Sequence, residues 1–352
     1  MKANIDVRGL KDYARSIELM LGREQSLVPI LDNTEEPENQ AYEPNSRTIQ
    51  NDMKPAERQP LKRWKLSLSG KQVLGERLKF PAPQGYPLGD SYFYYFHTRR
   101  EGPMKVILWA PGFGVSDLAF LFIKEFFRIE LSSGWDVLVW IPPYHLDRQM
   151  PGKKAGEGLI TPDLMSFRNN MNNAVHELAL GLSWLKKEGY ERIGAWGGSF
   201  GAASLLLLSQ QEDFDHIVLM IPLIDWNTIW DSLPFSGIRQ QFESKGVDPQ
   251  TVASVFASVS PRYAKYPQIP SDRILFLLAD YDQLTPLDVS ESYIASLGFG
   301  DNQEPVVRRF KESHSTILLN RGVYKEYQKF LEQIDKPISE IPKAVSISQG
   351  DH

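Results

Sequence analysis

Short apolar runs separated by amphipathic segments organise most of this sequence after residue 100. The runs cover residues 106–110, 137–141, 193–196, 217–221, 274–279 and, with more polar residues, 306–310. Such runs are typical of strands buried on both faces of a sheet. Between them, Val175, Leu178, Leu182 and Leu185 recur at helical spacing, and Gly189 follows as a stop signal. The alternation of strand and helix predicts an α/β domain with a mostly parallel sheet covered by helices.

The N-terminal part has a different pattern. Residues 9–31 fit an amphipathic helix, whereas residues 33–60 hold few apolar side chains and several prolines, so we interpret residues 1–60 as a helix and a polar arm. Alternating, aromatic-rich segments cover residues 64–68 and 92–96, which favours antiparallel strands that open the domain. We place the folded domain at residues 61–336 and a C-terminal tail at 337–352.

One interval, residues 225–271, is too long for a simple crossover helix and is rich in aromatic residues. It leaves the expected carboxyl end of a strand, which is where open α/β sheets bind their ligands. We interpret it as a cap in which Trp226 and Trp230 contact substrate. Ordinary packing helices of a large domain are the alternative.

Composition narrows the functional classes. The chain has 352 residues, of which 42% are hydrophobic and 24% charged, as expected for a globular protein. Its net charge of -5 and the lack of a lysine and arginine run argue against nucleic acid as a partner. The absence of cysteine excludes thiolate catalysis and disulfides and fits a reducing compartment, so we expect a cytoplasmic protein. We find neither an export signal nor a transmembrane segment.

Residues 197–201, Gly-Gly-Ser-Phe-Gly, fit the Gly-x-Ser-x-Gly pattern. A chain of this length shows that pattern by chance about one time in ten, but here a strand runs into it and residues 202–208 continue as a helix. This context predicts a nucleophile elbow with Ser199 as the nucleophile. Small neighbours are needed because the turn is tight, and the free N–H groups at the helix start favour negative charge. A glycine-rich turn with a bystander serine is the alternative.

A serine nucleophile needs a base to take its proton. Of the six histidines, His97 falls in an early strand, His145 in a loop after Pro142-Pro143, and His176 in a helix. His216 begins a strand and His352 ends the chain. Only His314 falls on a loop after the last strand, at the sheet edge where Ser199 is expected.

The third group is a carboxylate that holds the imidazole, expected between serine and histidine along the chain. The strand at 274–279 ends in Asp280 and Asp282, of which we prefer Asp282 because Asp280 is better placed to order the turn. Asp225 is the third choice. The oxyanion needs two backbone N–H donors, for which we expect Phe200 and Phe113, the latter in the glycine loop 111–114.

A serine elbow, an acid and a histidine in this order, with an oxyanion loop upstream, resemble the α/β-hydrolase superfamily over about residues 75–335. The Pro142-Pro143-Tyr144 turn, the Trp184-Leu185 to Gly189-Tyr190 helix end and Asp282 are similar to a little-characterised branch of hydrolase-domain proteins. The resemblance implies an eight-stranded sheet, a cap over a triad of Ser199, His314 and Asp282, and neither cofactor nor metal. Pro111 departs from the histidine that many members have there, which puts Phe113 in question.

These features predict hydrolysis of a small-molecule carboxylic ester with an apolar acyl or aryl group through an acyl-enzyme. A thioesterase, an acyltransferase, a peptidase or a carbon–carbon hydrolase could use the same triad. A non-catalytic protein that binds ligands through this fold is the contrasting hypothesis. The oligomeric state is left open.

Overall fold

The structure of the protein is a computed structural model. It describes residues 57–62, 65–68, 72–82, 88–98, 104–160, 163–230, 242, 244, 246–297 and 304–335. The helix expected at residues 9–31, the polar stretch up to residue 56 and the tail at 337–352 lie outside these ranges, so these three expectations stay untested.

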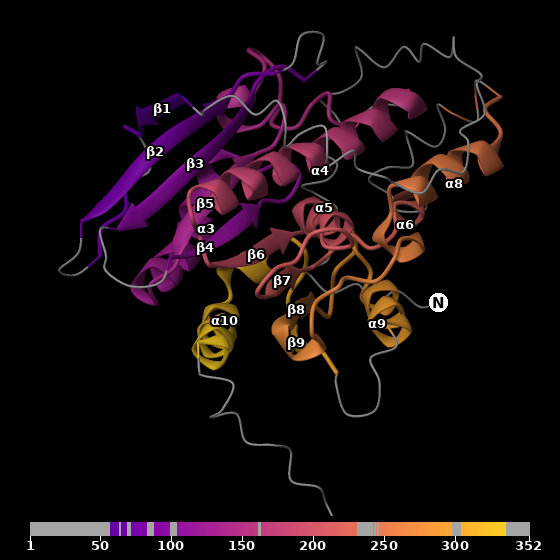
Figure 1. Ribbon diagram of the computed structural model, residues 1–352. Helices are drawn as coiled ribbons and strands as arrows, with labels where there is room; N and C mark the ends of the chain where they lie inside the picture. Colours follow the sequence, from indigo (N-terminus) through magenta and orange to yellow (C-terminus); the bar gives the residue numbers. More distant parts are fainter. Residues whose placement is uncertain are drawn as a thin grey trace, which may run out of the picture.

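The strands form one sheet (Figure 1). They are β1 (Glu57–Pro60), β2 (Val73–Phe80), β3 (Ser91–Thr98), β4 (Lys105–Ala110), β5 (Asp136–Ile141), β6 (Arg192–Gly198), β7 (Ile217–Met220), β8 (Ile274–Ala279) and β9 (Val306–Phe310). Their order across the sheet is β1-β2-β3-β5-β4-β6-β7-β8-β9. β1, β2, β3 and β5 pair antiparallel in turn, and every pairing from β5 onward to β9 is parallel.

The sheet of the described residues has nine strands, so the expectation of eight was wrong by one. The extra strand is β1, within the segment that we assigned to the polar arm. Its sequence, Glu-Arg-Gln-Pro, is exposed throughout and includes a proline, so no hydrophobic pattern marks it. Of the strand expected at 64–68, the described residues 65–68 belong to none of the nine strands.

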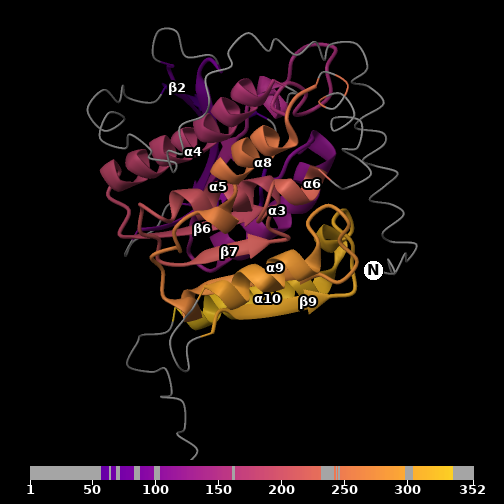
Figure 2. The same ribbon diagram turned by 90° about the vertical axis from the view of Figure 1, so that its right-hand side faces the viewer.

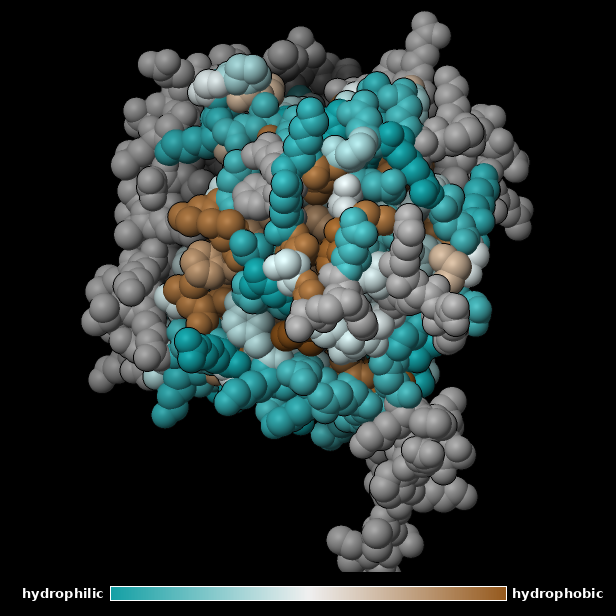
Figure 3. Space-filling model, turned by 90° about the vertical axis from the view of Figure 1, so that its left-hand side faces the viewer, coloured by the Kyte–Doolittle hydropathy of each residue, from teal (hydrophilic) through white to brown (hydrophobic). Residues whose placement is uncertain are grey.

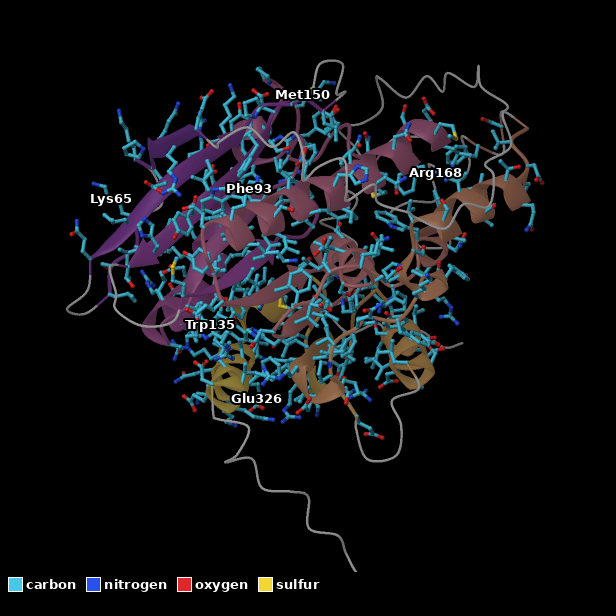
Figure 4. The ribbon with its side chains drawn as sticks, in the orientation of Figure 1. Lys65, Phe93, Trp135, Met150, Arg168 and Glu326 are labelled. Carbon is cyan, nitrogen blue, oxygen red and sulfur yellow. The ribbon has the colours of Figure 1, made fainter. Side chains whose placement is uncertain are left out.

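Helices cover both faces of the sheet. They are α3 (Asp117–Ser132), α4 (Leu164–Lys187), α5 (Phe200–Leu208), α6 (Asn227–Trp230), α8 (Pro249–Ser258), α9 (Leu287–Ser296) and α10 (Arg321–Ile334), with 3-10 helices η1 (Leu146–Arg148), η3 (Pro261–Tyr263), η4 (Ser271–Arg273) and η5 (Ile317–Leu319). α4, α5, α8 and α9 bury their apolar residues against one face, and α3 and α10 against the other. Figure 4 labels Phe93 on the side of α4 and Trp135 on the side of α10.

Local sequence explains where α4 begins and ends. The Asp163 carboxylate accepts the N–H groups of Met165 and Ser166, both at 3.1 Å, as an N-cap. The four apolar residues that the periodicity singled out are all buried on α4. Gly189, just beyond the helix, has a φ of 86°, a conformation that favours glycine.

The carboxyl ends of the parallel strands face the viewer in Figure 2, where α6 and α8 of the 225–271 interval lie beside α5. α8 starts with the Asp248 side chain as its N-cap and Pro249 at its first position. The described part of the interval therefore lies at the edge of the sheet where β6 passes into α5.

The amino ends of β4 and β6 lie on the opposite side of the molecule, where hydrophilic and hydrophobic side chains are mixed (Figure 3). Asp335, just after α10, accepts Lys105 Nζ at 2.9 Å and Arg192 NH1 at 2.8 Å. Both cations also lie over the Trp135 ring, at 4.8 and 4.9 Å from its centroid. These contacts tie α10 to the strands at the end remote from Ser199.

Candidate active site

Ser199 sits on a sharp turn between β6 and α5. Its backbone has φ 49° and ψ -115°, and it is one of four described non-glycine residues with a positive φ. Such a conformation costs about 1–3 kcal/mol and persists only where the surrounding structure imposes it. The side chain is half-buried, at the first turn of a helix whose following residues are all buried. The strand, turn and helix match the elbow that the sequence predicted.

Two hydrogen bonds hold the elbow against the end of the neighbouring strand. Ser199 N–H donates to the Met220 carbonyl at 2.9 Å, and Leu223 N–H donates to the Ser199 carbonyl at 3.2 Å. Between Met220 and Leu223, Ile221 has a positive φ of 41°, although its β-branched side chain disfavours that conformation. The chain after β7 is therefore fixed tightly around Ser199.

Asp282 and His314 come from loops that follow β8 and β9, and they meet. Asp282 Oδ2 lies 2.8 Å from His314 Nδ1. The Asp282 side chain is 1% exposed and that of His314 is 15% exposed. An ionised carboxylate can only accept, so His314 Nδ1 carries the proton and Nε2 is free of it in the neutral ring. This is the arrangement of a base held in one tautomer by an acid.

Three further donors fix the Asp282 carboxylate. Leu284 N–H and Thr285 N–H both donate to Oδ1 at 2.8 Å, and the Thr285 hydroxyl donates to Oδ2 at 2.7 Å. Thr285 Oγ1 also lies 3.3 Å from the Ile221 carbonyl oxygen and 3.3 Å from His314 Nδ1. Thr285 thus connects the acid and the histidine to the strand end that holds Ser199.

Glu312 organises the loop that carries His314. Its carboxylate accepts the Thr316 hydroxyl at 2.7 Å and the Asn320 amide at 3.0 Å. Its backbone carbonyl accepts Tyr281 N–H at 2.9 Å, which ties this loop to the loop of Asp282. Both loops are held before any substrate arrives, which is the preorganisation that catalysis requires.

The other two acids have different partners. Asp280 accepts Arg309 Nε at 3.0 Å in an exposed ion pair. Asp225 accepts the Tyr263 hydroxyl at 3.0 Å and Asn227 N–H at 2.9 Å. Among the three carboxylates that the sequence offered, the structure brings Asp282 to His314.

The glycine loop after β4 lies directly beside the elbow. A Cβ atom added to Gly112 would come within 3.4 Å of Ser199 Cβ and 3.3 Å of the Gly198 carbonyl oxygen. Gly114 N–H donates to His145 Nε2 at 2.8 Å. The Phe113 side chain is partly buried and packs edge-on against the His145 ring. Phe113 N–H and Phe200 N–H remain predictions as oxyanion donors.

The substrate contacts predicted for Trp226 and Trp230 both stay predictions. Trp226 is buried, and its ring packs against Phe167 and Phe200 at centroid distances of 5.0 and 6.4 Å. It lies next to the elbow through the Phe200 ring. The side chain of Trp230 lies outside the described part of the structure, so its predicted role stays untested.

Neither a membrane span nor a metal site marks the described residues. Within them, the helices do not include a segment that combines the length and the hydrophobicity of a membrane span. The same residues contain no cluster of three or more metal-ligating side chains.

Comparisons with known proteins agree with this geometry. The model of the prolyl oligopeptidase family matches residues 166–339, which include Ser199, Asp282 and His314 and make up just under half of the chain. No curated protein matches the sequence. The chain has the α/β-hydrolase fold. The predicted resemblance to the α/β-hydrolase superfamily is confirmed, and the matches support a serine hydrolase of the esterase type.

Solved structures show the same fold at low identity. This α/β-hydrolase resembles the acylaminoacyl peptidase of Pyrococcus horikoshii with a TM-score of 0.53 and 17% identity, covering 82% of this chain but only 43% of that one. It resembles the acetyl xylan esterases of Paenibacillus sp. R4 and Thermoanaerobacterium sp. JW/SL YS485 with TM-scores of 0.57 and 0.58, each at 14% identity. These two matches include 82% and 83% of this chain, respectively, and 92% of each esterase.

The sequence indicated no role for two residues that contact the candidate site, Thr285 and His145. Thr285 touches both Asp282 and His314, and its signal was its position three residues after the preferred acid. His145 binds the glycine loop from a different part of the chain. In the sequence, His145 is marked only by its place directly after the Pro142-Pro143-Tyr144 turn. That place does not reveal its partner Gly114, which lies 31 residues earlier in the chain.

Proposed function

We propose that this protein hydrolyses small carboxylic esters with Ser199 as nucleophile, His314 as general base and acid, and Asp282 as the group that orients His314. The observation that carries the proposal is the Asp282–His314 contact of 2.8 Å, at the sheet edge where Ser199 occupies a strained elbow. A triad needs this division of roles, since a serine hydroxyl is a weak nucleophile until its proton is taken.

The reaction follows from these positions. His314 Nε2 takes the Ser199 proton while Oγ attacks the ester carbonyl carbon, and the carbonyl oxygen becomes an oxyanion that the Phe113 and Phe200 amides stabilise. His314 then gives the proton to the leaving alkoxide, and the acyl group stays on Ser199. Water, deprotonated by His314, attacks the acyl-enzyme, after which the carboxylic acid leaves and Ser199 regains its proton.

The surroundings of the elbow favour an apolar acyl or aryl group. Trp226, Phe167 and Phe256 pack together on the side of α5, and the Trp226 ring contacts Phe200. Apolar substrate groups gain roughly 25 cal/mol per Å² of surface removed from water. We infer that this aromatic group forms one wall of the acyl site and that Trp230 adds to it.

A fluorophosphonate probe tests the nucleophile directly. Folded wild-type protein should become covalently labelled at one serine, and Ser199→Ala should not. A panel of p-nitrophenyl esters of increasing acyl length then measures specificity, with longer or aryl acyl groups expected to give the higher kcat/KM. Labelling that persists unchanged in Ser199→Ala, or no labelling of folded wild type, contradicts the proposal.

A peptidase is the second candidate because the family model that matches residues 166–339 is that of prolyl oligopeptidases. The same triad cleaves amides when the leaving amine is protonated, so only the substrate discriminates. Peptidyl p-nitroanilides assayed beside the esters decide between them. Thioesters and added alcohols in the same assay separate thioesterase and acyltransferase activity from ester hydrolysis.

A further inference from the structure

His145 is a buried histidine that belongs to the loop after β5 and contacts the glycine loop after β4. Its side chain is completely inaccessible to solvent. Its Nε2 lies 2.8 Å from Gly114 N, and its Nδ1 lies 2.8 Å from the Pro143 carbonyl oxygen. The ring also packs edge-on against Phe113 at a centroid distance of 5.6 Å.

These two partners determine the state of the ring. A carbonyl oxygen only accepts, so Nδ1 must carry a proton and donate it to Pro143. A backbone N–H only donates, so Nε2 must be unprotonated to accept from Gly114. The geometry therefore requires the neutral tautomer with the proton on Nδ1. A proton on Nε2 would face the Gly114 N–H, and a loss of the proton from Nδ1 would leave its lone pair facing the Pro143 carbonyl oxygen.

The backbone around His145 is unusually constrained. Tyr144 and Leu146, on either side of it, have φ angles of 65° and 47°. Such conformations are strained for residues with side chains and persist only where the surrounding structure imposes them. Arg148 holds the loop by donating to the Ile141 carbonyl at 2.9 Å and to both carboxylate oxygens of the buried Glu177, at 2.6 and 2.9 Å.

The segment around residue 156 also packs against the His145 ring. Gly156 lies so near that an added Cβ would come within 2.7 Å of both His145 Nε2 and the Phe113 ring. Its N–H donates to the Tyr144 carbonyl at 2.8 Å. The His145 ring and the Phe113 ring therefore both lie closely against Gly156.

We propose that His145 is a positioning residue for the oxyanion hole, and this inference rests on the proposed function. The loop of Gly112, Phe113 and Gly114 has two glycines, and Gly114 has a φ of 76°, so its own sequence leaves it flexible. The Nε2 lone pair of His145 fixes the Gly114 N–H and with it the peptides that precede it. Gly112 lies against Ser199, so the same contact holds Phe113 N–H where the substrate oxyanion forms.

This role predicts a specific kinetic effect. Donors stabilise an oxyanion because they are fixed before the reaction, and loss of one such donor typically costs about 10²–10³-fold in kcat. Loosening the loop without removing the donor should cost less, about 10- to 50-fold in kcat. The ground-state carbonyl binds the hole weakly, so KM should change by about threefold or less.

A pair of variants isolates the Gly114 contact. His145→Gln keeps an acceptor at the position of Nε2, whereas His145→Asn keeps a donor near Nδ1 for Pro143 but cannot reach Gly114. On the best p-nitrophenyl ester, we expect kcat to fall about 10- to 50-fold in His145→Asn and to stay within about fivefold of wild type in His145→Gln. The rate of fluorophosphonate labelling should follow the same order, because the phosphonyl oxygen uses the same hole.

The outcomes separate this inference from the proposed function. If wild-type protein is not labelled and cleaves no ester, both are overturned. If wild type is active and the Gln and Asn variants, shown by circular dichroism to be folded, lose kcat equally or not at all, only the inference is overturned. Imidazole ¹⁵N NMR of wild type tests it even if a variant does not fold, since a proton on His145 Nε2 would contradict the contact with Gly114.

Discussion

The Cα atom of Gly201 faces the Ala110 carbonyl so closely that a Cβ on residue 201 would lie 1.9 Å from that oxygen. The Pro111 carbonyl oxygen would be only 2.6 Å from the same Cβ. The first turn of α5 therefore packs directly on the chain where β4 passes into the glycine loop. The elbow and the glycine loop 111–114 are therefore packed together through the backbone contact of Gly201.

Gly201→Ala should destabilise the protein strongly because the new methyl group meets backbone atoms that cannot rotate away. Overpacking in a tight core costs about 1–3 kcal/mol, and we expect at least the upper value here. Gly198→Ala is the matched control, since its Cβ would meet only side chains, at 3.4 Å from Trp196 and 3.7 Å from Met220. Urea unfolding of both variants checks this, and equal stabilities would contradict the close approach of Gly201 to Ala110.

Thr285→Val should lower kcat about tenfold and should also lower the unfolding free energy by about 1–1.5 kcal/mol, because a buried hydrogen bond is lost. Valine matches the shape of threonine but removes the hydroxyl that donates to Asp282 Oδ2 at 2.7 Å. A lost hydrogen bond of about 1–1.5 kcal/mol in the orientation of the acid corresponds to that factor. Thr285→Ser keeps the hydroxyl and should stay near wild type. Equal kcat values for the Val and Ser variants would exclude a role of the hydroxyl.

Asp282→Asn should reduce kcat by roughly 10⁴-fold, because an amide that replaces the carboxylate can select the wrong tautomer of His314. Asp280→Asn removes only an exposed ion pair with Arg309 and should stay within about twofold of wild type. Steady-state kinetics on one ester compares the two. A larger loss in Asp280→Asn would reverse our choice of acid.

The parallel part of the fold could be predicted because its strands are buried on both faces and read as apolar runs. β8, for example, is Ile-Leu-Phe-Leu-Leu-Ala and is buried throughout. β1 could not be predicted because its four residues are all exposed, and the pairing of its backbone with β2 at the edge of the sheet therefore has no hydrophobic pattern to mark it. β2 is half-buried and contains Gly75, which weakens its alternation, and the alternation of apolar and polar residues at 64–68 gave a stronger but misleading signal.

The candidate site likewise has a part that the sequence predicted and a part that it did not. The chemistry of each residue and its place after a strand led to Ser199, Asp282 and His314, because the carboxyl ends of parallel strands meet at one edge of a sheet. Contacts between distant loops have no such rule. Gly114 and His145 are ordinary loop residues in the sequence, and their hydrogen bond depends on how the loops after β4 and β5 fold together.

Glu130 on α3 is a buried carboxyl group whose ionisation should make the stability of the protein depend on pH. It is fully buried and accepts Trp109 Nε1–H at 2.7 Å and the Tyr327 hydroxyl at 2.5 Å. Burial raises the pKa of Glu130 from 4.5 to about 8, although both hydrogen bonds oppose the rise. Trp109 stacks on Trp196 at a centroid distance of 3.6 Å, so Glu130 contacts, through Trp109, the strand that leads to Ser199.

The sign of the effect follows from proton linkage. Between pH 4.5 and 8 the folded protein keeps a proton on Glu130 that the unfolded chain releases. The stability that comes from this proton is therefore complete below about pH 4.5 and is lost as the pH rises through 8. Glu130→Gln keeps the shape and one acceptor but cannot ionise. Its unfolding free energy relative to wild type should increase by a few kcal/mol as the pH rises from 5 to 8.5. Urea unfolding of both proteins at pH 5, 7 and 8.5 measures this difference, and parallel stability curves over that range would show that Glu130 does not hold a proton at neutral pH.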